Sequence, residues 1–176
     1  TNTAPSVQDY VDAGVLGVTT GNLTVVNAAI AAAVKTDADS TAEVQTLATI
    51  AAAAQTAALL KIDAWANDNT DPANAPTADD YTAAGVVNVN ATNLNEINQL
   101  IAALVAGQAD TAQKVQTIVN APATVSSVAI TSATGALNSR LNEGDEVEIT
   151  VTMNRSVVVS TEGGTPKLAL TIGTAT

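Results

Sequence analysis

The sequence predicts an α+β protein whose helices and strands lie in separate domains: two small three-helix bundles in tandem, followed by an incomplete antiparallel β-sandwich segment. Three observations predict this class. Residues 4–47 and 75–118 form an ungapped repeat with 20 identities in 44 positions, and repetition at a fixed period is typical of arrays. Apolar residues recur every three to four positions in both copies, as in amphipathic helices, and after residue 123 the period changes to two, as in strands. We therefore expect domains over 1–70, 71–121 and 122–176.

Composition excludes several kinds of chemistry. The 176 residues contain no Cys and no His, which excludes disulfides, thiolate nucleophiles, His/Cys zinc sites and imidazole catalysis. The net charge is −11, and the six Lys and Arg residues are scattered. A nucleic-acid partner is disfavoured, because phosphate binding needs clustered cations. Membrane insertion is not expected, because Gln55, Thr56 and Lys61 interrupt the Ala-rich stretch that would have to span the bilayer.

The first helix of each copy is expected from its flanking residues. Ser6 is a candidate N-cap with Asp9 three residues later, and Gly14 can adopt the left-handed conformation after a helix over 6–13. The second copy has the equivalent N-cap candidate, acidic residue and glycine 71 positions later. A second helix is expected over about 20–35. Its apolar face would consist of Leu23, Val26, Ile30 and Val34.

Two asparagines of the first copy recur at the equivalent positions of the second copy. Asn22 corresponds to Asn93, and Asn27 corresponds to Asn98. Two interpretations are open. The asparagines could form a row that contacts a ligand, or they could cap helix starts and bond to the neighbouring loop, as asparagines at helix starts commonly do.

The third helix of the first copy is expected to be long, over about 41–66. Ser40 and Glu43 have the spacing of a capping box. In the second copy the helix should be shorter, because Pro122 follows soon after Ile118. The apolar seam of the long helix is expected at Leu47, Ala51, Ala54, Ala58, Ile62 and Trp65.

The C-terminal segment alternates apolar and polar residues and predicts about four strands. Such a number is too small for a closed sandwich, which needs about seven. We therefore expect that the domain is truncated or that another strand completes it. The alternating residues are Val128 and Ile130; Val147, Ile149, Val151 and Met153; Val157–Val159; and Leu168, Leu170 and Ile172.

Three stretches of this segment, 128–138, 141–147 and 165–172, resemble the opening half of an Ig-like repeat from very large secreted bacterial surface adhesins. The helical copies resemble the Ala-rich modules with the pattern DYxxAGVxxVxxxNLxxVN in proteins of that kind, here beginning at Asp9 and Asp80. The resemblance implies a location outside the cell, on the bacterial surface. It also implies neighbouring repeats of the same polypeptide, or other copies of it, as partners.

A calcium site is the one cofactor that the resemblance suggests. Calcium in such adhesins often lies at junctions between Ig-like repeats, and here its oxygen ligands would come from Asn142, Glu143 and Asp145. The neighbouring Glu146 and Glu148 alternate along a strand, which is equally typical of a solvated outer face. No pair of carboxylates is set in an apolar cleft, so we expect no enzyme.

The function expected from these features is structural: a non-enzymatic, extracellular spacer or stalk segment of an adhesin or filament. Two alternatives remain open. A helical bundle could bind a host protein, which an exposed apolar patch on the second or third helix would favour. Alternatively, the chain could be a self-assembling fibre subunit whose β segment is completed by strand exchange.

Overall fold

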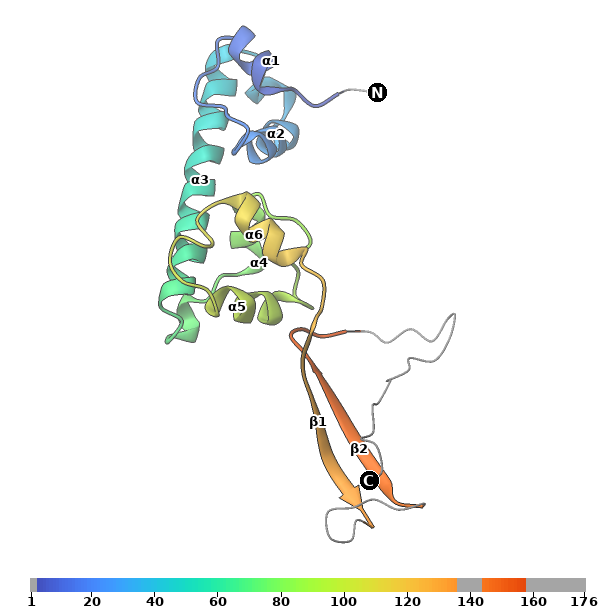
Figure 1. Ribbon diagram of the computed structural model, residues 1–176. Coiled ribbons are helices and arrows are strands. Elements are labelled where there is room, and N and C mark those ends of the chain that lie inside the picture. Colours follow the sequence, from blue (N-terminus) through green and yellow to red (C-terminus); the bar gives the residue numbers. More distant parts are fainter. Residues whose placement is uncertain (1–2, 136–143, 158–176) are drawn as a thin grey trace. The chain divides into compact units, whose positions relative to one another are not determined.

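The computed structural model describes residues 3–135 and 144–157, and the chain divides into two compact units, Thr1–Ala121 and Pro122–Thr176. The described residues form six α-helices and one two-stranded antiparallel sheet, so the protein combines helices with a sheet (Figure 1). All six helices belong to the first unit, and both strands belong to the second.

The first repeat contains helices α1 (Val7–Asp12) and α2 (Leu23–Ala32), the short 3₁₀ helix η1 (Lys35–Asp37) and the start of the long helix α3 (Thr41–Asn67). Both expected capping boxes form, with reciprocal hydrogen bonds between Ser6 and Asp9 and between Ser40 and Glu43. Because these boxes satisfy backbone N–H groups at the helix starts, they fix where α1 and α3 begin.

The second repeat contains the 3₁₀ helix η2 (Pro72–Asn74) and the helices α4 (Ala78–Ala83), α5 (Leu94–Ala102) and α6 (Ala112–Val119). Each of these three α-helices begins 71 positions after its counterpart in the first repeat. As the sequence predicts, α6 ends before Pro122 and is much shorter than α3.

Helix α3 belongs to the cores of both repeats, and α1 and α2 lie beside its first half while α4 and α5 lie beside its second (Figure 1). The described residues therefore do not confirm two separate three-helix bundles in tandem. Ala48 and Ala51 pack with the first repeat, around Tyr10 and Val26. The α3 residues in the core of the second repeat are Ala58, Ile62, Trp65 and Ala66.

The expected apolar faces are wrong at two positions. Ala54 of α3 is exposed, whereas the adjacent Gln55 is buried. Val34 lies beyond the end of α2, and 62% of its surface is exposed. Alanines occupy several faces of α3, which weakens the periodic signal that should identify the buried face.

By length and composition alone, one helix in the described part of the chain, α3, is apolar enough to cross a membrane. The expectation that the chain does not insert into a membrane therefore stays a prediction. The result is weak evidence for a membrane span, because the core helix of a soluble protein passes the same test. In the structure, α3 packs against α2, α4 and α5.

The second unit contains β1 (Val125–Thr134) and β2 (Glu146–Met153), which pair antiparallel with Ile130 opposite Ile149. These strands confirm two of the predicted segments, and two register irregularities lie along β1. Every β1 residue is exposed. The described residues show one two-stranded sheet and no Ig-like sandwich. The predicted strand at Leu168–Ile172, and Val157–Val159 except its first residue, lie outside the described residues.

Candidate functional site: the joint between the helical repeats

The asparagines Asn27 and Asn98 each connect a tyrosine to a proline carbonyl. In the first repeat, Tyr10 Oη donates to Asn27 Oδ1 at 2.6 Å, and Asn27 Nδ2 donates to the carbonyl oxygen of Pro5 at 2.9 Å. The second repeat has the same two bonds through Asn98, at 2.7 and 2.8 Å. Both ends of each amide are thus used inside the fold, which favours the structural interpretation over a ligand-contact row.

Asn22 and Asn93 hold the loop in front of α2 and α5. The Asn22 amide donates to the carbonyl of Gly17 at 2.9 Å and accepts from the N–H of Thr19 at 2.7 Å. Asn93 makes the equivalent bonds to Asn88 and Asn90. Neither side chain caps its own helix, so bonding to the loop explains why these residues recur.

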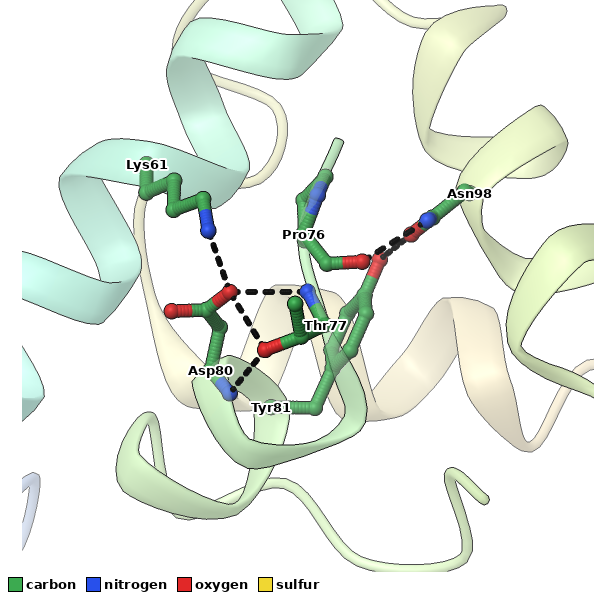
Figure 2. Close-up of polar contacts among 6 residues, drawn as sticks. All are labelled: Lys61, Pro76, Thr77, Asp80, Tyr81 and Asn98. Atoms are coloured by element: carbon green, nitrogen blue, oxygen red, sulfur yellow. Dashed lines mark hydrogen bonds and ion pairs between the residues drawn. The ribbon is translucent and has the colours of Figure 1, made fainter. Parts of the chain in front are cut away.

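The second half of α3 joins the second repeat through a cluster at the start of α4 (Figure 2). Lys61 Nζ lies 2.6 Å from Asp80 Oδ2, and the same oxygen accepts from the backbone N–H of Thr77 at 2.7 Å and from its hydroxyl at 2.8 Å. Asp80 therefore caps its own helix and binds a cation from α3 at once.

The protonation of Asp80 is controlled by these contacts. Burial by itself would raise the pKa of the Asp80 carboxyl, but the hydrogen bonds from Lys61 and Thr77 outweigh burial and hold the pKa below its ordinary value. The carboxylate is therefore charged at neutral pH, where it can pair with Lys61.

Tyr81 lies beside this cluster (Figure 2), and its side chain is fully buried. Burial raises the pKa of its phenol far above the ordinary value, and the neighbouring charge of Asp80 adds to the shift. The hydroxyl therefore stays protonated and keeps donating to Asn98.

Three further polar side chains tie α3 and the residues after it to the second repeat. Trp65 Nε1 donates to the carbonyl of Asn98 at 2.9 Å. Asp63 Oδ1 accepts from the backbone N–H groups of Gly107 and Ala109 at 2.8 and 3.2 Å. Asn69 Nδ2 donates to the carbonyl of Ala102 at 3.0 Å.

Gln55 connects the two repeats directly, and sequence reasoning missed it. Its amide nitrogen donates to the carbonyls of Gly21, in the first repeat, and Ala84, in the second, both at 3.0 Å. Gly85 has φ +81°, and a Cβ there would lie 3.1 Å from Val25 Cγ1 and 3.3 Å from the Gln55 amide nitrogen. A glycine is thus required both by the backbone conformation and by the close approach of the repeats. The signal in the sequence was a lone Gln within an alanine run.

A groove of about 650 Å³ lies at this junction of the two repeats. Its lining contains hydroxyl and amide side chains but no Asp, Glu, Lys, Arg or aromatic residue, so the groove offers neither acid–base catalysis nor a stacking platform for a sugar. The polar side chains of the lining are Thr19, Thr20, Asn22, Thr24, Gln55, Thr56, Thr111, Gln113 and Gln116.

The predicted calcium ligands are only partly covered by the structure. Asn142 and Glu143 lie outside the described residues, and Asp145 packs directly against Gly135 at the end of β1. In the described ranges there is no group of three acidic, His or Cys side chains that could hold a metal ion. The calcium site at Asn142, Glu143 and Asp145 therefore stays a prediction. Asp68 and Asp71, between α3 and η2, accept hydrogen bonds from Thr70 and Ala73.

The sequence matches no protein-family model, no curated protein and no solved structure.

Proposed function

We propose that the chain is a non-enzymatic spacer segment of a large bacterial surface adhesin or filament, located outside the cell. The single observation that carries this proposal is helix α3, whose two halves lie in the cores of consecutive repeats. A helix shared in this way joins two repeats without a flexible linker, which a segment that must keep its length and direction requires.

The use of the repeated polar residues supports the same proposal. The Tyr–Asn–Pro bonds, the capping box of the first helix and the loop-holding asparagines recur in both copies and bond within the fold. A sequence repeated for binding would be expected to keep side chains that project into solvent or into a cleft. These residues instead stabilise the same helical architecture in each of the two copies.

The Ig-like sandwich belongs to this proposal as well. A two-stranded hairpin alone is marginal in water, and three or more strands with an apolar face are needed for independent stability. The alternation of half-buried Val147, Ile149 and Met153 with exposed Glu146 and Glu148 supports a sheet with one inner face. Calcium at Asn142, Glu143 and Asp145 remains a prediction of the resemblance.

A second candidate function is a binding module, and the outer face of α3 favours it. Ile50 and Leu60 are 61% and 67% exposed. With the exposed Ala53, Ala57 and Ala64 they form an apolar stripe at spacings of three and four, and such a stripe could receive a helix of another protein.

Chromatography with light scattering, in millimolar calcium and in EDTA over a range of concentrations, tests the spacer proposal. A spacer should remain a monomer at every concentration. Concentration-dependent polymers would contradict a passive spacer and support strand exchange through the exposed residues of β1. A monomer that behaves identically in both buffers would contradict the predicted calcium site and would agree with the spacer proposal.

A further inference from the structure

The second half of α3 covers one face of the second repeat. The equivalent face of the first repeat is uncovered. We call this counterpart the receiving face. Its residues are exposed or half-buried, whereas the residues 71 positions later are all buried. The receiving face consists of Pro5, Ala13, Asn27, Ile30 and Val44; the buried counterparts are Pro76, Ala84, Asn98, Ile101 and Val115.

The receiving face already has the internal structure of its covered counterpart. The Tyr10–Asn27–Pro5 bonds agree with those of the second repeat within 0.1 Å, at 2.6 and 2.9 Å against 2.7 and 2.8 Å. The Ser6–Asp9 capping box matches the box of Thr77 and Asp80. The first repeat therefore needs no rearrangement to receive a helix in the way that the second repeat does.

The second half of α3 defines the chemistry of a matching helix. It supplies Ala58 and Ile62 to the core, Lys61 to the capping aspartate, and Trp65 to the carbonyl of Asn98. In the first repeat the corresponding partners are the carboxylate of Asp9 and the carbonyl of Asn27. This chain's own α3 cannot serve, because Ile62 is fully buried in the second repeat.

We propose that the receiving face binds the second half of an α3-type helix, Ala-rich and carrying Lys, Ile and Trp at the spacing of Lys61, Ile62 and Trp65. The helix comes from a further unit of the same repeat that precedes Ala4 in an array. This inference rests on the proposed spacer function. It deepens that function, because each added repeat would then extend one continuous line of shared helices.

An extended chain tests the proposal. A copy of residues 50–74 replaces residues 1–3, so that the copied Asn74 is followed by Ala4 and Pro5 as the natural Asn74 is followed by Ala75 and Pro76. Docking should slow amide hydrogen exchange in α1 and α2 by about tenfold or more, because local opening would then also require the added helix to detach. Exchange in α5 should not change.

Two exposed alanines provide matched variants. Ala13→Arg should leave the unextended chain unaffected and abolish the protection in the extended chain, because the counterpart Ala84 is fully buried. Ala28→Arg should preserve the protection, because its counterpart Gln99 is exposed. Replacing both the copied Ile62 and the copied Trp65 by Ala should also remove it.

Unchanged exchange in α1 and α2 would overturn the proposal, as would protection that persists in Ala13→Arg. Dimers of the unextended chain with α1 and α2 protected would overturn it too, by showing that a second copy covers the face. None of these results would bear on the rigidity of the joint inside the helical unit. Failure of this inference is thus distinguishable from failure of the spacer function.

Discussion

At the scale of single residues, the two tyrosines are a natural matched pair. Tyr10 and Tyr81 each donate to an asparagine, but Asn98 is buried and Asn27 is half-buried. Tyr81→Phe would leave the Asn98 oxygen without this donor in the core, and we expect a loss of about 1–3 kcal/mol in the free energy of unfolding. Tyr10→Phe should cost less, because water can reach Asn27. Equal losses in urea denaturation of the two variants would contradict this account of burial.

The pKa of Asp80 gives a prediction about pH. Because folding lowers this pKa, the contribution of the carboxylate is fully present above the unfolded value of about 4 and is lost as pH falls through the lower, folded value. Thermal unfolding of the wild type and of Asp80→Asn should therefore differ most near neutral pH. The difference should shrink as the solution is acidified below about pH 4. A gap between the two proteins that stays constant with pH would refute the role assigned to the charge.

At the scale of elements, α3 is expected to couple the unfolding of the two repeats. Ala53 is exposed and lies between Ala51, in the first core, and Ala58, in the second. Ala53→Pro removes a helical hydrogen bond and should cost about 3 kcal/mol or more. Ala53→Gly, the control, should cost about 1 kcal/mol. Only the proline variant should unfold in two steps in calorimetry, and a single cooperative transition for it would mean that the repeats are coupled by other contacts.

The elements also show which features the sequence could predict. The helix starts followed from local chemistry: Ser6 with Asp9 and Ser40 with Glu43 form the expected capping boxes. The buried position of Gln55 did not follow, because its partners, Gly21 and Ala84, are about 30 residues away along the chain in opposite directions. Local periodicity carries no information about such contacts.

At the scale of the whole molecule, the repeat was evident from the sequence but the sharing of α3 was not. The second copy retains Val115, Gln116 and Thr117, and Pro122 a few residues later predicted a shorter third helix and no more. The extra length of α3 forms the joint between the repeats, because its Ala58, Ile62 and Trp65 side chains pack in one core with α4 and α5. Only tertiary packing reveals this arrangement.

The central claim is that α3 fixes the two repeats relative to each other, and the distance between α2 and α5 tests it most directly. The chain has no Cys, so spin labels at Ala28→Cys and Gln99→Cys, both exposed and at equivalent positions of the repeat, would be specific. Pulsed electron–electron double resonance should give one narrow distance distribution, which broadens when Ala53→Pro is added. A broad distribution in the protein without the proline would contradict the claim, because the repeats would then move independently.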